Sequence, residues 1–149
     1  MKFQSPQQKA IINLRITSNE IGSRQTKYMS QFGISMAQFN ILRILRGAKE
    51  ALTVNTIKQR MIEKSPNTTR LLDKLLEKKL IDKIPCDSDR RQTYIEINSE
   101  GLKLLSKIGD GTSKFSLIAS ELTDNEAETL SELLDKMRNS FSSLDDIDK

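Results

Sequence analysis

The chain has 149 residues, of which 30% are charged and 36% hydrophobic, a composition typical of an ordinary globular protein. It contains no histidine and a single cysteine, which excludes His-ligated zinc sites, Ser-His-Asp and Cys-His nucleophile pairs, and an intrachain disulfide. No run of about 18 apolar residues exists, so no transmembrane helix is expected. Residues 1–10 lack the apolar core of a secretory signal, so a cytoplasmic location is the default expectation.

The net charge of +4 is unevenly distributed along the chain. Residues 1–51 carry 8 Lys/Arg and 2 Asp/Glu, residues 52–95 carry 10 and 6, and residues 96–149 carry 6 and 12. The first two parts are therefore basic and the last third is acidic. This asymmetry fits a polyanionic partner for the basic part, and it also fits solvated, Lys-rich helix faces, so charge alone leaves both interpretations open.

Residues 8–30 are predicted to form the first helix, because apolar residues recur there at helical spacing between polar flanks. Gly33 interrupts this pattern, and Ser35 with Gln38 then forms a capping box that opens a second helix over residues 36–47. Gly47 is expected to end that helix. The apolar stripe of the first helix comprises Ile11, Ile12, Leu14, Ile16 and Ile21, and the inward residues of the second are Phe39, Leu42 and Leu45.

Two shorter helices are predicted next. Thr53 is expected to cap the third helix, and Ser65 with Pro66 to open a fourth that runs to Lys79, because serine caps helices and proline suits the first helical position. At about 100° per residue, Asn67, Arg70 and Lys74 lie on the outer face of the fourth helix. The expected inward residues are Val54, Ile57, Met61 and Ile62 in the third helix and Leu72, Leu75 and Leu76 in the fourth.

The period of the apolar residues changes after residue 80. A short extended stretch around residues 81–84 and an alternating stretch over residues 93–97 flank the polar segment 86–91, which predicts a hairpin with a charged tip. Asn98 is expected to cap a helix over residues 99–119 that Gly109 and Gly111 weaken, and Thr123 to open a last helix that includes Leu144. The sequence therefore predicts a mainly α fold with one small β-hairpin.

The order of these elements is that of a helix-turn-helix followed by a hairpin, or wing. A helix-turn-helix places the start of its second helix in the major groove of DNA. In the fourth helix, Asn67 can hydrogen-bond base edges, Arg70 can bind guanine or phosphate, and Lys74 can reach the backbone. Free amides at its N-terminus suit a phosphate. The predicted DNA-binding residues of this helix are Ser65, Asn67, Thr68, Thr69, Arg70 and Lys74.

The hairpin tip carries the second part of the predicted DNA-binding site, Asp89, Arg90 and Arg91. Such a tip suits insertion of arginine into a narrow minor groove, where the negative potential is enhanced. Asp89 is positioned to hold a guanidinium in a fixed pose. Taken alone, the segment is better explained as a solvated Asp–Arg pair of little energetic weight. Its position directly after a helix-turn-helix favours the wing.

These motifs resemble the MarR family of winged-helix transcriptional regulators. Residues 35–38 resemble the start of that family's second helix, and residues 65–77 resemble its recognition helix. Residues 80–81, 89–91 and 98–101 follow at the family's spacing, so the resemblance covers nearly the whole chain.

The resemblance implies that Arg91 enters the minor groove, that Asp89 orients it, and that Arg90 contacts the DNA backbone. The chain departs from the family pattern at a few positions. Lys79 stands where glycine is usual, and Asn98 stands where threonine is usual. Residues 86–87 are Cys-Asp in place of the common Asp-Pro.

The chain is interpreted as one domain, residues 1–149. Residues 34–98 are expected to form the winged helix-turn-helix, and residues 1–33 and 99–149 the dimerisation helices. A two-fold dimer would supply two half-sites for a pseudo-palindromic operator in double-stranded DNA. Alternatively, the apolar stripe of the last helix covers the chain's own core. The predicted dimerisation residues are Ile12, Leu130, Leu133, Leu134, Met137 and Phe141.

The expected function is that of a homodimeric, sequence-specific transcriptional regulator, a repressor released by a small-molecule effector. The resemblance implies a small, frequently aromatic effector, but no motif identifies its site. The thiol of Cys86 is either a modifiable group that would disturb Arg91 or an incidental surface cysteine.

The alternative is a winged-helix protein-interaction module or anti-repressor that does not bind DNA. No cofactor or metal is expected. No enzyme is expected either, since no phosphate loop, metal cluster or nucleophile–base pair is present.

Overall fold

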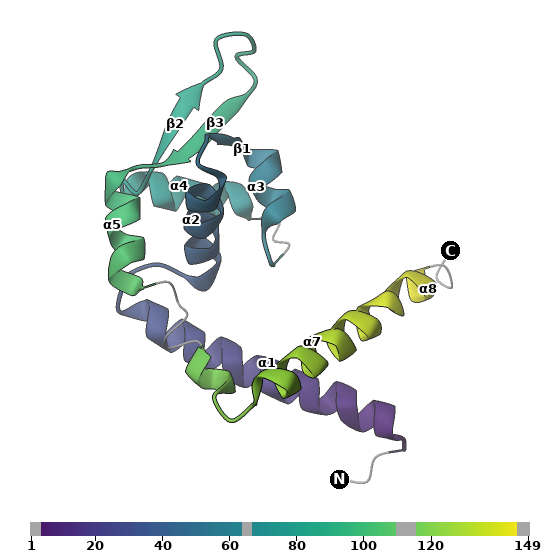
Figure 1. The fold of residues 1–149 in the computed structure, drawn as a ribbon. Coiled ribbons are helices and arrows are strands. Elements are labelled where there is room, and N and C mark those ends of the chain that lie inside the picture. The colour runs from purple at the N-terminus through teal and green to yellow at the C-terminus, as the bar shows by residue number, and fades with distance from the viewer. Residues whose placement is uncertain (1–3, 64–66, 110–115, 146–149) are drawn as a thin grey trace. The chain divides into compact units, whose positions relative to one another are not determined.

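The computed structural model describes residues 4–63, 67–109 and 116–145. The chain divides into two compact units, residues 1–110 and 111–149, and each is described by itself. The first unit contains α1 (Pro6–Ser30), α2 (Met36–Ala48), β1 (Leu52–Thr53), α3 (Val54–Arg60), α4 (Thr68–Glu77), β2 (Ile81–Pro85), β3 (Thr93–Ile97) and α5 (Ser99–Ile108) (Figure 1). The second contains the 3₁₀ turn η1 (Ser116–Ala119), α7 (Asp124–Asn139) and α8 (Phe141–Asp145).

Helix α2 forms the centre of the first unit. It contacts α1, α3, α4, α5 and β3, and its predicted inward residues Phe39, Leu42 and Leu45 are all buried. Ile41 is fully buried as well, because helices or strands cover α2 on more than one face. The hydroxyl of Tyr28 donates to the Ile108 carbonyl at 3.0 Å, which ties the end of α1 to the end of α5.

The helix starts at Ser35 and Thr53 follow the predicted caps, whereas α4, which was predicted to open at Ser65, begins at Thr68 with Asn67 as its N-cap. Ser35 and Gln38 form both halves of the capping box, and the side chain of Thr53 accepts from the main-chain N–H of Thr56. The first helix begins at Pro6, earlier than predicted, because Ser5 caps it and proline occupies its first turn.

The end of the second helix was predicted wrongly. Gly47 lies inside α2, and the helix instead ends at Ala48, followed by the C-cap Lys49, which adopts a left-handed conformation with φ of 55°.

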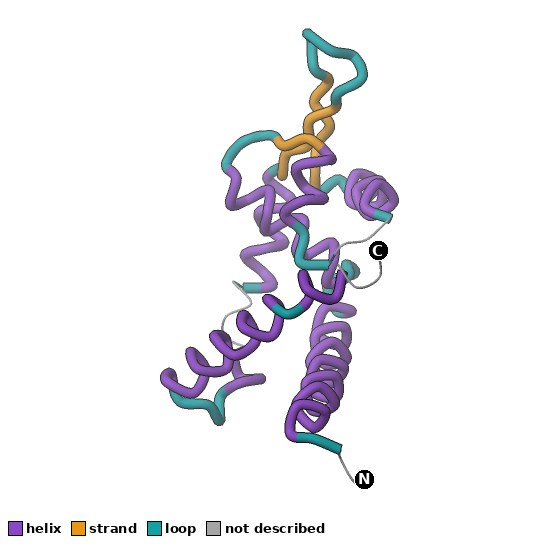
Figure 2. Tube along the Cα trace, turned by 90° about the vertical axis from the view of Figure 1, so that its right-hand side faces the viewer, coloured by secondary structure: helices purple, strands orange, loops and turns teal. Residues whose placement is uncertain are grey.

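The sheet has three antiparallel strands in the order β1-β3-β2. The predicted hairpin is confirmed, with Ile81 opposite Ile97 and Pro85 opposite Thr93. Strand β1 was not predicted: its Leu52 pairs with Ile95, which adds a third strand to the base of the hairpin. Figure 2 shows β2 and β3 twisting about each other and extending beyond the helices of the first unit.

The predicted helix over residues 99–119 is wrong. Helix α5 begins as expected, since the side chain of Asn98 accepts from the Gly101 N–H at 3.0 Å, but it ends at Ile108. Gly109 has a φ of +80°, which no helical residue adopts, so the helix stops there. Gly111 and Phe115 lie outside the described residues, and η1 follows at Ser116.

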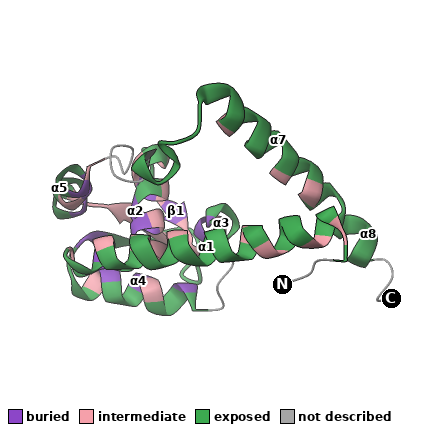
Figure 3. Ribbon diagram, turned by 90° about the horizontal axis from the view of Figure 1, so that it is seen from below, coloured by how far each residue is buried: buried purple, intermediate pink, exposed green. Residues whose placement is uncertain are grey.

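The second unit begins its long helix α7 at the predicted capping box, in which Thr123 and Glu126 exchange both hydrogen bonds. The predicted single helix to Leu144 is divided at Ser140 into α7 and α8. Leu133 and Phe141 are 57% and 52% exposed, and most of α7 and of α1 is exposed (Figure 3). None of the helices in the described parts of the chain is long and apolar enough to cross a membrane.

Candidate nucleic-acid interface

Helix α4 is held in place by its inner face. Leu72 and Leu75 are buried as predicted, and so is Thr68, whose hydroxyl donates to the sulfur of Met61 at 3.6 Å. Residues 68, 72 and 75 lie on one side of a helix, and this shared side explains the burial of Thr68. Thr68 was predicted to contact DNA, and its burial removes that side chain from the surface: it anchors α4 against the end of α3.

The outer face of α4 presents the other predicted residues of this helix. Thr69, Arg70 and Lys74 are exposed, and Arg70 and Lys74, four residues apart, share one face. Asn67 is also exposed and precedes the first turn, where it makes no side-chain capping bond. Asp73 and Glu77 lie on the same side of the helix, so this face has a mixed charge. The predicted cap Ser65 lies outside the described residues.

The turn before α4 differs from the prediction at one residue. Ile62, predicted to point inward, is 82% exposed, because α3 ends at Arg60 and the chain turns away from the core. The Asn40 side chain accepts from the Ile62 main-chain N–H at 3.1 Å, which fixes the turn to α2. The last buried residue before the turn is therefore Met61, which directly follows α3.

The end of α4 has the hydrogen bonds of a Schellman motif. The N–H of Leu80 donates to the Leu75 carbonyl at 3.1 Å, and the N–H of Lys79 donates to the Leu76 carbonyl at 2.9 Å. Lys79 has a φ of +56°, a conformation that favours glycine, and it stands where the MarR-type pattern has glycine. The chain thus keeps this turn without glycine, and α4 ends at Glu77 instead of at Lys79.

The hairpin tip is ordered by its own main chain. The N–H of Cys86 donates to the Gln92 carbonyl at 3.3 Å, and the N–H of Gln92 donates to the Asp89 carbonyl at 3.0 Å. The Asp89 carboxylate accepts from the main-chain N–H of Arg91 at 2.9 Å. Arg90 and Arg91 are exposed.

This geometry changes the expected role of Asp89. Among the ion pairs of the described residues, none joins Asp89 to Arg90 or Arg91. Asp89 therefore orients Arg91 through the fold of the turn, and both guanidinium groups are left to solvent or to a ligand.

Cys86 lies at the start of the tip with a free, half-buried thiol. Its sulfur is 3.1 Å from the Ser88 hydroxyl, and this hydrogen bond, together with main-chain bonds from Asp89 and Ser88, lowers the pKa of the Cys86 thiol. The hydrogen bonds stabilise the thiolate.

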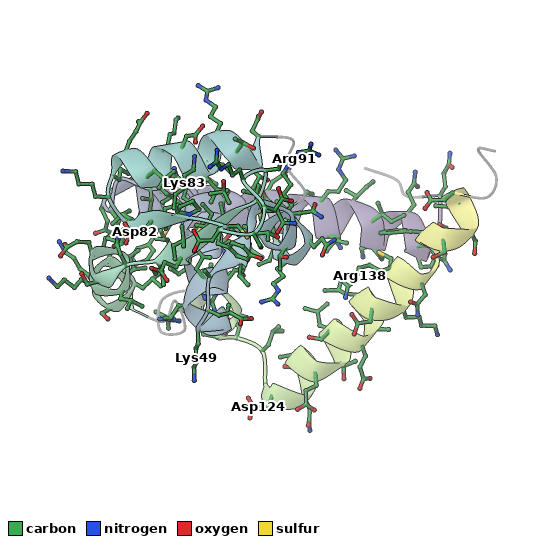
Figure 4. The ribbon with its side chains drawn as sticks, turned by 90° about the horizontal axis from the view of Figure 1, so that it is seen from above. Lys49, Asp82, Lys83, Arg91, Asp124 and Arg138 are labelled. Carbon is green, nitrogen blue, oxygen red and sulfur yellow. The ribbon has the colours of Figure 1, made fainter. Side chains whose placement is uncertain are left out.

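Lys83 is a basic residue that the sequence analysis did not single out. It is exposed on β2, between the end of α4 and the hairpin tip. Figure 4 looks down on the hairpin. It shows Lys83 and Arg91 at the hairpin and Lys49 pointing to the opposite side of the first unit. Strand alternation puts Lys83 on the same face of β2 as the buried Ile81, so alternation in the sequence did not indicate that Lys83 would be exposed.

Chemistry other than DNA binding finds little support at this surface. Across the described segments of the chain, no three His, Cys, Asp or Glu side chains are grouped to hold a metal ion. Exposed cations on one helix and on an adjoining β-hairpin suit a double-helical polyanion, since the two elements can occupy neighbouring grooves.

Comparison with known proteins supports this interpretation. The sequence model of the MarR family matches residues 34–93, the segment from α2 to the start of β3. Residues 34–93 thus carry the domain of the MarR family. Proteins of the MarR family regulate transcription and are not enzymes.

Individual relatives are similar to this chain over most of its length. The HTH-type transcriptional regulator MhqR of Bacillus subtilis is 26% identical over 87% of this chain and 89% of its own length. A structure of Staphylococcus aureus MepR in complex with DNA is 28% identical, with a TM-score of 0.75 over 87% of this chain and 96% of that chain. A MarR-like structure from Bacillus cereus, 18% identical, shares the fold with a TM-score of 0.78 over 89% and 96% of the two chains.

Proposed function

We propose that this MarR-family chain is a homodimeric transcriptional repressor that binds a pseudo-palindromic operator and is released by a small-molecule effector. The observation that carries the DNA-binding part is the pairing, in one compact unit, of the exposed Arg70 and Lys74 on α4 with the exposed Arg90 and Arg91 on the hairpin tip. The 28% identical MepR was crystallised with DNA, which supports the same assignment.

Each half of the dimer would contribute two kinds of contact. Helix α4 would lie in the major groove, where Asn67 and Arg70 reach base edges and Lys74 reaches a phosphate. The hairpin would follow the adjacent minor groove, with Arg91 inserted and Arg90 on the backbone. Thr69 and the helix N-terminus, including Ser65, would approach phosphates.

The dimer would form through the exposed apolar residues of the terminal helices. Leu130, Leu133, Leu134 and Met137 recur at helical spacing along one side of α7, and Phe141 continues the apolar series into α8. Exposed apolar stripes of this size are uncommon on monomers, which supports an interface. Ile12 on α1 is half-buried within the single chain and would be covered further in the dimer.

Release would follow from the two-fold geometry. Two recognition helices must reach successive major grooves about one helical turn apart. An effector that binds better to a dimer with another separation of these helices lowers DNA affinity by its preference for that state. The aromatic effector inferred from the family resemblance is tested by competition with operator binding.

Selection of bound DNA from a random pool tests the proposal directly. Recovery of an inverted repeat, with half-sites about one helical turn apart, is the expected result. A single unrepeated site, or no enrichment, would contradict the homodimeric part or the whole proposal respectively. Sedimentation of the purified protein as a monomer at the concentrations that bind DNA would also contradict the dimer.

The competing function is a winged-helix protein-interaction module or anti-repressor that does not bind DNA. Titration of bulk duplex DNA at two salt concentrations separates the two functions, because binding through phosphates must weaken steeply as salt increases. Absence of binding even in dilute buffer would favour the protein-interaction module.

A further inference from the structure

Asn98 joins three elements of the first unit through one side chain. Its Oδ1 accepts from the Gly101 N–H at 3.0 Å and so caps α5. Its Nδ2 donates to the main-chain carbonyl of Lys79 at 3.0 Å, just beyond the end of α4, and to the carboxylate of Asp82 on β2 at 3.2 Å. A side chain that would serve only as a helix cap needs the first of these bonds alone.

The chemistry of the partners fixes the orientation of the amide. The Gly101 N–H is a donor, so the atom facing it must be the oxygen. The Lys79 carbonyl and the Asp82 carboxylate accept hydrogen bonds, so the atom facing them must be the NH₂ group. All three contacts therefore require the same assignment, and a reversed amide would lose all of them.

The backbone around Asn98 is closely packed and leaves little freedom. Its N–H donates to the Leu80 carbonyl at 3.3 Å. A Cβ on Gly101 would lie 2.3 Å from the same carbonyl oxygen and 2.6 Å from a side-chain carbon of Ile97. The first turn of α5 thus rests directly on the segment 78–80, which connects α4 to β2.

We infer that Asn98 is a positioning residue for DNA binding, which sets the angle between the recognition helix α4 and the wing by joining the Lys79 carbonyl to Asp82. This inference rests on the proposed function. The connection between α4 and β2 is only residues 78–80, so a rotation there swings the hairpin tip relative to α4. The two hydrogen bonds from Nδ2 oppose that rotation, because their partners lie on either side of Leu80, the last residue of the connection. The Lys79 carbonyl precedes Leu80, and Asp82 follows it on β2.

The assignment explains why asparagine serves here where threonine would serve as a cap. Threonine offers a γ-oxygen to the Gly101 N–H, but its single O–H cannot replace the two N–H donors that bind the Lys79 carbonyl and Asp82 together. The substitution Asn98→Thr therefore breaks the connection between Lys79 and Asp82 and keeps the cap. It separates the positioning role from the stability of α5.

A double-mutant cycle on DNA affinity tests this role. The dissociation constant for the inverted-repeat duplex recovered by the selection above is measured for the full-length protein and for Asn98→Thr, Arg91→Ala and the double variant. If Asn98 positions the wing, the loss caused by Arg91→Ala shrinks by about threefold or more in the Asn98→Thr background. Asp82→Ala, which breaks one of the two bonds, should give a smaller coupling of the same sign.

A matched control distinguishes positioning from loss of stability. Thr123→Ala removes a helix cap of the same kind in the other compact unit, and its effect should multiply with that of Arg91→Ala without coupling. Protection of the Gly101 amide from hydrogen exchange should persist in Asn98→Thr, since its cap is retained.

Each result bears on a defined part of the argument. Multiplicative effects of Asn98→Thr and Arg91→Ala, in a protein that binds the duplex, overturn the positioning role and leave the proposed function intact. Failure of the unsubstituted protein to bind any duplex overturns both.

Discussion

Replacement of Lys79 by glycine should stabilise the protein. With a φ of +56°, Lys79 occupies the left-handed region, which costs a residue with a Cβ about 1–2 kcal/mol. Glycine avoids that cost but loses about 0.5–1 kcal/mol more backbone entropy on folding. Because the Lys79 side chain is exposed, little contact is lost, so the net gain in the free energy of unfolding should be about 0.5–1 kcal/mol.

Lys78→Gly provides the matched control, since it removes the same charge from the neighbouring residue. Lys78 has a φ of −77°, so glycine relieves nothing there and should destabilise by about 0.5–1 kcal/mol. Urea denaturation at one fixed protein concentration measures both variants, with unchanged m-values as the check that only stability has moved. The reasoning is refuted if Lys79→Gly is no more stable than the parent, or if both variants shift in the same direction.

Further predictions concern the DNA contacts, one close approach and one titrating group. Arg91→Ala should weaken operator binding by about 1–3 kcal/mol in a gel-shift titration. An unchanged titration for this variant would remove the wing from the mechanism. Lys74→Ala should mainly reduce the salt dependence of binding, by about one unit in the slope of log K against log salt concentration. Gly101→Ala should destabilise by about 1–3 kcal/mol in thermal unfolding, because its Cβ would overlap the Leu80 carbonyl. The hydrogen bonds of the capping box lower the pKa of Glu126 below its usual 4.5, so the stability they add is present above that pH and is lost as the pH falls through the lowered value. Glu126→Gln should therefore flatten the acid side of the stability profile measured by circular dichroism, and a profile identical to the parent's would count against this cap.

Local signals in the sequence predicted most of the fold. The capping residues Ser35, Thr53, Asn98 and Thr123 all begin helices as expected, because a cap depends on a few neighbouring residues. The hairpin was predicted from a short extended segment and from alternation in the segment after the polar tip. The same kind of signal was overlooked at Ser5 and Pro6, which repeat the Ser-Pro pattern noted at residues 65–66.

The errors arose where distant contacts or single dihedral angles decide the structure. Strand β1 has only two residues and exists because Leu52 meets Ile95, a pairing that no local period reveals. Gly109 was expected only to weaken α5, but it leaves the helical region at no steric cost and ends the helix. Lys49 and Lys79 end their helices in a conformation that composition would assign to glycine.

The candidate site was predicted better in its exposed residues than in its geometry. Arg70, Lys74 and Arg91 are at the surface as expected, since charged residues rarely lie in a core. Thr68 could have been assigned to the inner face from its spacing to Leu72 and Leu75. The bond between Asp89 and the main chain of Arg91 could not be foreseen, because carboxylates in turns bind main-chain and side-chain donors alike.

Strand β2 lies at the margin of the sheet, with β3 on only one side of it. The unpaired side of such a strand is a template on which a second molecule can add its own strand, which leads to aggregation. Two residues of β2 discourage this: Lys83 brings a charge that would be crowded in a neighbouring strand, and Pro85 has no N–H to offer it. The protein can therefore be present at high concentration without its hairpins joining into a continuous ribbon.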